Sequence, residues 1–197
     1  MTILFVNACP RTCSNTKILA EYLLSKLQGN VQERNLTQAA LSPLTEQRVE
    51  QRTNLISKGD FSHPLFALAK EFAAANKIVI AAPLWDLSFP SLLKIYIEHI
   101  NALGVTFGYQ ADGNPYGLCK AQKLYYVTTA GGPILSDAYG YGYIKALAEQ
   151  FYGIPNVYCI KAENLDVDGA EIENMLRQTK RDIDALLAKT ERPIIQK

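Results

Sequence analysis

The 197-residue sequence lacks the features of nucleic-acid-binding, membrane-spanning and disulfide-stabilised proteins. Its 20 basic and 19 acidic residues give a formal net charge of +1 without a basic block, so nothing electrostatic supports nucleic-acid binding. No apolar run approaches the ~20 residues that span a bilayer. The four cysteines match no zinc or iron–sulfur spacing, so we expect free thiols and no metal site at Cys9, Cys13, Cys119 and Cys159.

Histidines and targeting signals are also scarce. The only histidines are His63 and His99, and no Ser-His-Asp arrangement is visible, so hydrolase chemistry has no support. We expect His99 to be a packing or interface residue. The chain enters a strand-like segment directly after Met1, without a charged leader or a cleavage site, so we expect a cytoplasmic protein. Its length fits a single domain over residues 1–197.

The first informative stretch is residues 2–27, which read as a short apolar strand, a polar loop and a helix. A strand–loop–helix unit aims free backbone N–H groups and the positive end of the helix at one point, which favours an anion. The loop has neither the G-x-x-x-x-G-K-[ST] nor the G-x-G-x-x-G pattern, which argues against a triphosphate or a dinucleotide. A single terminal phosphate, as in FMN, suits its donors, which are Arg11, Thr12, Ser14, Asn15 and Thr16. The alternative is a polar helix cap without a ligand.

Strands and helices alternate along the rest of the chain. The sequence predicts strands at residues 2–7, 31–36, 77–82, 123–130 and 156–162. Six helices are predicted between and after these strands. The first follows the first loop, the second and third cover residues 43–57 and 65–76, the fourth begins at Ser91, the fifth ends at Phe151, and the sixth follows a cap at Asp168. This pattern predicts an α/β fold, a flavodoxin-like doubly wound five-stranded parallel sheet of order 2-1-3-4-5 with helices on both faces. Its ligand would lie at the switch point between strands 1 and 3.

Two further loops should meet the phosphate loop at the carboxyl edge of this sheet. After the third strand, Trp85 and Phe89 offer apolar cover for a flat ring, and Pro83 offers a rigid turn. After the fourth strand, Gly131 and Gly132 would let the backbone approach a ligand closely, because neither has a Cβ. Each feature has an ordinary structural alternative, a core tryptophan or a simple turn. Residues 37–64 form a long connection that could cover the site or contact a second copy.

Five motifs carry a family resemblance, and they are spread over nearly the whole chain. The sequence resembles the flavodoxin-like NAD(P)H:quinone and azo-compound oxidoreductases, the FMN-dependent azoreductase family. The motifs are Arg-Thr-Cys-Ser-Asn-Thr at 11–16, Ala-Pro-Leu-Trp-Asp-Leu at 82–87, Gly-Val-Thr-Phe-Gly-Tyr at 104–109, Thr-Ala-Gly-Gly at 129–132 and Phe-Tyr-Gly-Ile at 151–154.

The resemblance implies a set of cofactor and substrate residues. Around the FMN phosphate it implies Arg11, Thr12, Cys13, Ser14, Asn15 and Thr16. Along the isoalloxazine it implies Pro83, Leu84, Trp85, Asp86 and Leu87 on one side, and Thr129, Ala130, Gly131 and Gly132 on the other. Members are homodimers with two sites at the interface, where Tyr109 and Phe151 would wall the substrate slot. Two departures are Asp86, where azoreductases usually carry Asn, and Ala130, where several carry a bulkier polar residue.

The resemblance also implies a reaction. Hydride would pass from NADH or NADPH through FMN to a quinone, azo or nitro-aromatic acceptor in a ping-pong mechanism, without a catalytic protein residue. One alternative is a non-enzymatic flavodoxin-type electron carrier, although such carriers are usually strongly acidic and this chain is not. An FMN-binding interaction protein is another. A receiver domain is disfavoured because the first strand ends in Asn7 and the third runs into Pro83, where acidic residues are needed.

Overall fold

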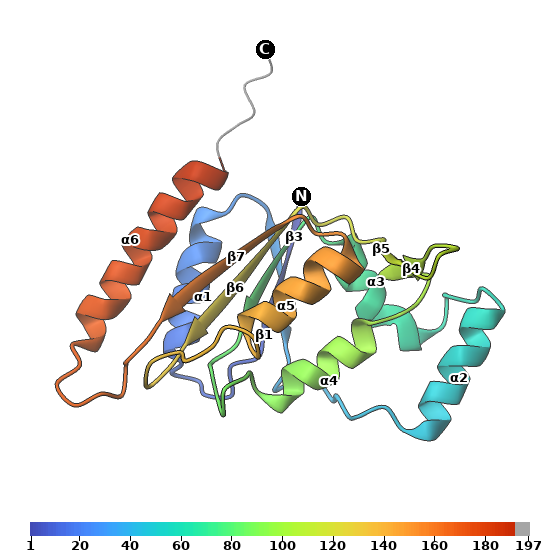
Figure 1. The fold of residues 1–197 in the computed structure, drawn as a ribbon, viewed down its shortest axis with the longest axis horizontal. Coiled ribbons are helices and arrows are strands. Elements are labelled where there is room, and N and C mark those ends of the chain that lie inside the picture. The colour runs from blue at the N-terminus through green and yellow to red at the C-terminus, as the bar shows by residue number, and fades with distance from the viewer. Residues whose placement is uncertain (192–197) are drawn as a thin grey trace, which may run out of the picture.

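The computed structural model describes residues 1–191, built around one five-stranded parallel sheet (Figure 1). The strands lie in the order β2-β1-β3-β6-β7, and every neighbouring pair is parallel. Their bounds are β1 Thr2–Asn7, β2 Asn30–Asn35, β3 Lys77–Ala81, β6 Lys123–Thr129 and β7 Asn156–Ala162. The predicted five-stranded parallel sheet is therefore confirmed, with exposed, polar β2 at one edge as expected.

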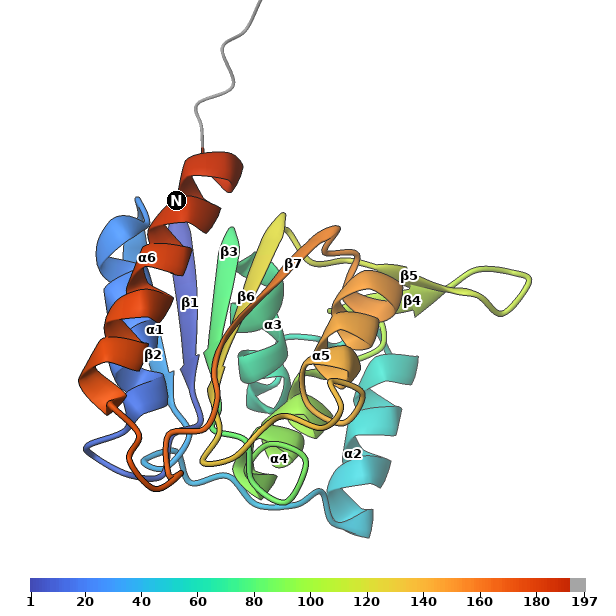
Figure 2. The same cartoon turned by 60° about the vertical axis from the view of Figure 1, so that its left-hand side comes forward.

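Helices cover both faces of the sheet (Figure 2). Their bounds are α1 Asn15–Lys26, α2 Glu46–Ser57, α3 Ala67–Ala74, α4 Ser91–Ile100, α5 Tyr141–Leu147 and α6 Ile172–Thr190. Short helical segments precede α3 at Pro64–Phe66 and follow α5 at Ala148–Tyr152. On one face, α1 and α6 bury apolar side chains against the sheet, and α3, α4 and α5 do so on the other. One core lies on each face, and the central strands β1, β3 and β6 between them are buried on both sides.

The last helix differs from its prediction at its start. It begins at Ile172 with Glu171 at the N-cap position, so the predicted cap at Asp168 is wrong. Gly169 adopts a left-handed backbone conformation with φ of 80°, which a helix cannot continue through. Farther along this helix, Leu187 is buried, and Leu186 is partly buried and packs against the same core.

Two short strands were not predicted from the sequence. β4 (Phe107–Tyr109) and β5 (Pro115–Gly117) pair antiparallel as a hairpin outside the main sheet. The hairpin projects beyond the helices (Figure 2). Residues 37–64 contain α2, which buries none of its own residues and begins at Glu46 with Thr45 as its cap, later than predicted.

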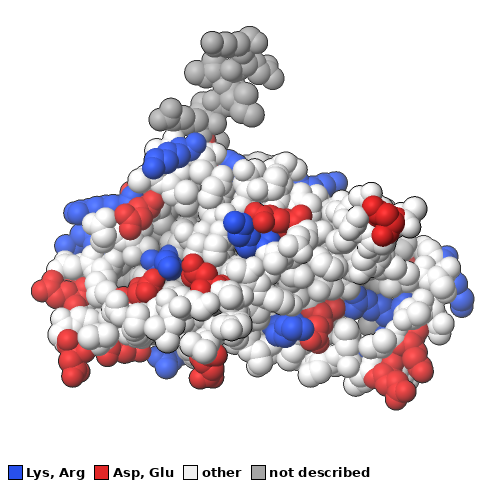
Figure 3. Space-filling model, viewed as in Figure 1, with Lys and Arg blue, Asp and Glu red and all other residues white. Residues whose placement is uncertain are grey.

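The end of α6 is fastened to the sheet by an ion-pair cluster, which we define as Glu191, Lys77, Lys123 and Tyr125. Both lysines and the tyrosine hydroxyl donate hydrogen bonds to the Glu191 carboxylate. Burial raises the pKa of Glu191, but these hydrogen bonds outweigh burial and hold its pKa below the ordinary value. Elsewhere, charges of both signs are interspersed over the visible surface (Figure 3).

Candidate functional site

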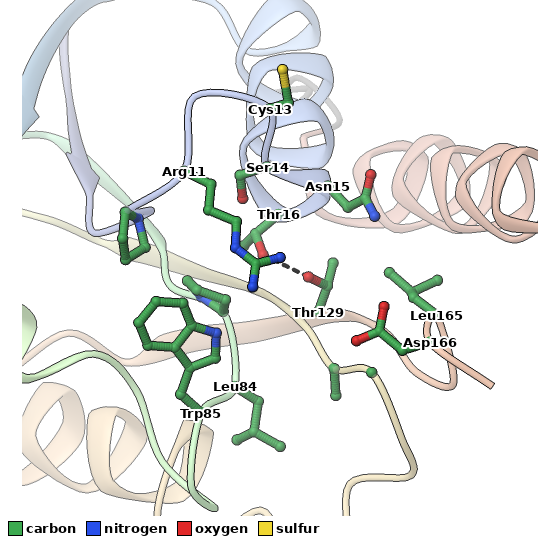
Figure 4. A pocket seen from close by; sticks show the side chains of 14 residues that line it. Arg11, Cys13, Ser14, Asn15, Thr16, Leu84, Trp85, Thr129, Leu165 and Asp166 are labelled. Carbon is green, nitrogen blue, oxygen red and sulfur yellow. Dashed lines mark hydrogen bonds between the residues drawn. The ribbon is translucent and has the colours of Figure 1, made fainter.

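The loops that leave the carboxyl ends of β1, β3, β6 and β7 enclose a cavity of about 150 Å³ (Figure 4). Parallel strands bring these ends to one edge of the sheet, where ligands of α/β folds bind. The cavity is lined by Pro10, Arg11, Cys13, Ser14, Asn15, Thr16, Pro83, Leu84, Trp85, Thr129, Ala130, Gly131, Leu165 and Asp166. All three loops predicted to share a ligand therefore contribute to one cavity. Four predicted cofactor-binding residues do not line it, namely Thr12, Asp86, Leu87 and Gly132.

The N-terminus of α1 forms the polar end of the cavity. Ser14 is the N-cap residue, and its Oγ accepts a hydrogen bond from the backbone N–H of Lys17 at 3.4 Å. The N–H groups of Asn15 and Thr16 belong to the first turn, so they have no acceptor within the helix. The guanidinium of Arg11 points into the same space (Figure 4). These groups together form a site for an anion at the positive end of the helix.

A buried hydroxyl pair ties this helix to the sheet. The Oγ1 atoms of Thr16 and Thr129 lie 2.7 Å apart, and both side chains are buried. Asn7 fixes the start of the loop, because its Oδ1 accepts from the N–H of Cys9 at 3.0 Å and its Nδ2 donates to Glu33 at 2.8 Å. The cavity wall at the carboxyl ends of β1 and β6 is therefore held by side chains as well as by backbone hydrogen bonds.

The loop after β3 makes a tight turn over residues 85–88. Trp85 and Ser88 exchange two backbone hydrogen bonds of 2.8 Å, and Asp86 and Leu87 between them have φ of 50° and 67°. This is the geometry of a two-residue type I′ turn, which is strained for a leucine. The turn directs Trp85 into the cavity, whereas Asp86 and Leu87 line a second hollow. That is the physical reason why two predicted residues do not line the cavity.

Leu165 and Asp166, in the loop after β7, were not predicted. Backbone hydrogen bonds join this loop to the one after β6: Leu165 N–H donates to Ala130 C=O at 3.1 Å, and Asp166 N–H to Gly131 C=O at 2.9 Å. A Cβ at Gly131 would lie 2.2 Å from Asp166 Oδ2, whereas one at Gly132 would meet no atom within 4 Å. The missing Cβ at Gly131 thus makes room for a carboxylate of the protein itself, and Gly131 still lines the cavity.

Comparison with known proteins identifies the family. A model described as the flavodoxin-like fold matches residues 1–187. The chain belongs to the flavodoxin-like fold family. It is 34% identical over 183 residues to FMN-dependent NADH:quinone oxidoreductase 2 of Clostridium acetobutylicum. This alignment covers 88% of the present chain and 90% of that relative. The resemblance to FMN-dependent quinone and azo-compound oxidoreductases, predicted from the sequence, is confirmed.

Solved structures show the same fold at lower sequence identity. An azoreductase from Bacillus anthracis strain Sterne superposes with a TM-score of 0.81 at 22% identity, covering 96% of this chain and 99% of its own. An FMN-dependent NADH-azoreductase from Bacillus anthracis strain Ames Ancestor, solved in complex with FMN, also gives 0.81 at 20% identity, covering 98% and 100%. At these identities the likeness establishes the flavodoxin-like fold of this chain.

The two aromatic residues predicted for the substrate slot do not line the cavity. Tyr109 lies on β4, and its ring packs edge-on against Phe107 with centroids 5.5 Å apart. Phe151 packs against the same Phe107 ring at 5.1 Å. The structure therefore places Tyr109 and Phe151 together, in an aromatic group at the hairpin.

Two of the cysteines and one histidine lie away from the cavity in buried or partly buried surroundings. All four cysteines are free, as predicted, and burial raises the pKa of Cys119 and Cys159 to about 12, so these thiols stay protonated at neutral pH. His99 is buried and its Nε2 lies 2.9 Å from the Ser42 carbonyl oxygen, which fits the predicted packing role. Within residues 1–191 no cluster of three metal-ligating side chains is found, and no helix there is long and apolar enough to cross a membrane.

Proposed function

We propose that this chain is an FMN-dependent oxidoreductase that passes hydride from NADH or NADPH through FMN to a quinone, azo or nitro-aromatic acceptor. The observation that carries the proposal is the position of the cavity. The loops after β1, β3 and β6 meet there, and β1 and β3 are neighbours in the sheet, whose order is β2-β1-β3-β6-β7. In a sheet wound as 2-1-3-4-5, this is the switch point where a flavin binds. The quinone oxidoreductase of Clostridium acetobutylicum supports the same cofactor and donor.

The residues that line the cavity fit FMN. One end supplies the Arg11 guanidinium, the hydroxyl of Ser14 and the free N–H groups at the start of α1, which suit a phosphate dianion. The other end supplies Pro83, Leu84 and Trp85, which suit an apolar ring. We propose that Thr129, Ala130 and Gly131 lie along the opposite side of the ring, as the resemblance implies.

The work of the protein side chains in this proposal is to bind, orient and shield. FMN, when bound, supplies the two-electron chemistry, so no protein nucleophile or acid–base pair is needed. Trp85 would cover the ring, and the Thr16–Thr129 hydroxyl pair joins α1, whose N-terminus would hold the phosphate, to the end of β6. The ping-pong order of donor and acceptor remains part of the proposal.

We also propose a homodimer in which residues 1–197 form one FMN-binding domain per copy. The aromatic group at the hairpin supports this, because Tyr109 is more than half exposed on a projecting element. From one copy, Tyr109 and Phe151 would wall the acceptor slot at the partner's cavity. The cytoplasmic location remains a prediction.

The first experiment is a visible absorbance spectrum of the purified protein before and after anaerobic NADH or NADPH. A yellow protein that bleaches and is re-oxidised by a quinone would support the enzyme. A yellow protein that neither nucleotide reduces would instead be an electron carrier. A colourless protein that takes up no added FMN would refute the flavin site.

Arg11→Ala tests the phosphate end directly. We expect FMN affinity to fall by about 1.5–3 kcal/mol, the usual contribution of a hydrogen bond to a charged group. The measurement is an FMN titration followed by flavin fluorescence. Arg48→Ala is the matched control, because Arg48 is also exposed but lies on α2 and does not line the cavity. Equal FMN affinity of the wild type and Arg11→Ala would mean that the loop is only a helix cap.

A further inference from the structure

The loop after β6 forms one wall of the cofactor cavity, although its residues there belong to no helix or strand. Its first part is held by backbone hydrogen bonds to the end of β7. The N–H of Ala130 donates to the Ala162 carbonyl oxygen at 2.9 Å, and the N–H of Asn164 donates to the Gly132 carbonyl oxygen at 3.1 Å. The next residue, Pro133, has no N–H and cannot extend this backbone pairing.

A side chain, that of Glu163, makes the next contact to this loop. Its Oε2 accepts a hydrogen bond from the backbone N–H of Ile134 at 2.9 Å. Glu163 directly follows β7, and two residues farther along Leu165 lines the cavity. One short segment therefore contributes to the cavity wall and also holds the neighbouring loop, at the place where the backbone alone cannot do so.

The other carboxylate oxygen of Glu163 faces a cation. Oε1 lies 3.1 Å from Nζ of Lys161, which also lies 3.7 Å from a carboxylate oxygen of Asp137. The Lys161 side chain is 40% exposed, and ion pairs of exposed side chains contribute little. The hydrogen bond from Ile134 is the largest cause that holds the pKa of Glu163 below its ordinary value, while partial burial opposes it and Lys161 adds less. The contact with Ile134 is therefore the stronger of the two.

We propose that Glu163 is a positioning residue for FMN, which holds the loop after β6 in place through the N–H of Ile134. Glu163 does not line the cavity, so it acts on the cofactor through this loop. The assignment rests on the proposed function, in which Ala130 and Gly131 lie along one side of the flavin ring. The hydrogen bonds of the main sheet do not involve Glu163, so its loss should affect the cavity more than the fold.

The test combines an FMN titration, followed by flavin fluorescence, with amide hydrogen exchange at Ile134, measured by NMR on FMN-free and FMN-loaded protein. In Glu163→Ala we expect exchange at Ile134 to become about 10-fold faster and FMN to bind about 3- to 10-fold more weakly, because the N–H loses a charged acceptor. Glu163→Gln should stay within about 3-fold of wild type in both quantities, because its amide oxygen can accept the same N–H. Glu163→Asp keeps the charge but is one methylene shorter, so it should resemble Glu163→Ala.

Two further variants separate this hydrogen bond from the effect of charge. Lys161→Met removes the ion pair but keeps the Ile134 contact, so both quantities should change by less than about 2-fold. Glu149→Ala is the matched control, because Glu149 pairs with Lys145 at 3.8 Å on the outside of the molecule and does not line the cavity. It should bind FMN as wild type does. Glu163→Asp also serves as the test if Glu163→Ala does not fold.

The positioning role and the proposed function fail separately in this experiment. Wild-type FMN affinity in Glu163→Ala would overturn the positioning role, and so would weaker binding without faster exchange at Ile134. Equal weakening by Glu163→Gln and Glu163→Ala would also overturn it, because the effect would then follow the charge and not the hydrogen bond. Wild-type protein that takes up no FMN would refute the flavin site, whereas faster exchange at Ile134 in FMN-free Glu163→Ala would still show that Glu163 holds the loop.

Discussion

Adding one methyl group at Gly131 tests whether the loop after β7 shapes the cofactor cavity. A Cβ there would lie 2.2 Å from Oδ2 of Asp166, 2.9 Å from its Cγ and 3.1 Å from its Cβ. The exposed carboxylate can rotate away, but the 3.1 Å contact requires a shift of a few tenths of an ångström. We therefore expect Gly131→Ala to lower the free energy of unfolding by about 1 kcal/mol, the low end for overpacking.

The same substitution should affect FMN binding. Arg11 and Asp166 point into the cavity from opposite sides (Figure 4), so a displaced carboxylate that turns inward adds negative charge near the phosphate position. Two unit charges about 4 Å apart in water interact by about 1 kcal/mol, which corresponds to roughly a 5-fold weaker FMN affinity. Urea denaturation gives the stability change, and a fluorescence titration gives the affinity.

Two variants make this reasoning refutable. Gly132→Ala should change neither quantity, because its Cβ meets no atom within 4 Å and neither glycine has a left-handed φ. Adding Asp166→Ala to Gly131→Ala should restore FMN affinity, because no carboxylate is left to turn inward, but should keep most of the stability loss, since the 3.1 Å contact with the Cβ of residue 166 remains. If Gly132→Ala were as costly as Gly131→Ala, or if the double variant bound FMN as weakly as the single one, the clash with Asp166 would not be the cause.

Two further predictions concern stability. Gly117→Ala places a Cβ 2.1 Å from the backbone N of Gly153, so we expect thermal denaturation to show a loss of about 3 kcal/mol or more, whereas Gly108→Ala meets only a side chain and should cost less. The ion-pair cluster predicts a pH dependence: because the folded-state pKa of Glu191 is depressed, its stabilisation is present above the ordinary value of 4.5 and is lost as the pH falls through the folded-state pKa. Glu191→Gln should lower stability at pH 7 by about 1–2 kcal/mol and flatten this acid limb, and a variant that kept the wild-type profile would show that the cluster contributes nothing.

Local patterns were sufficient for the parts of the fold that local chemistry determines. β3 is buried at every position, and its continuous apolar run predicted a strand covered on both faces. Ser14 caps α1 through its side chain, and a polar loop rich in serine and asparagine is typical of such a cap. The hairpin could not be found in this way, because its strands are three residues each, too short to show alternation. The turn at Asp86 and Leu87 could not be predicted from the sequence either, since leucine rarely adopts a positive φ.

Asp166 shows that a prediction can fail even where a rule was available. The rule that parallel strands end at one edge applies to β7 as well as to β3 and β6, so it also brings the loop after β7 to the cavity. What the rule could not give is the pairing of that loop with residues 130 and 131, which depends on two backbone hydrogen bonds between distant parts of the chain. That pairing gives Gly131 a structural role that the sequence could not reveal. Its missing Cβ makes room for the protein's own carboxylate in the cavity wall, whereas a Cβ at Gly132 would meet no atom within 4 Å.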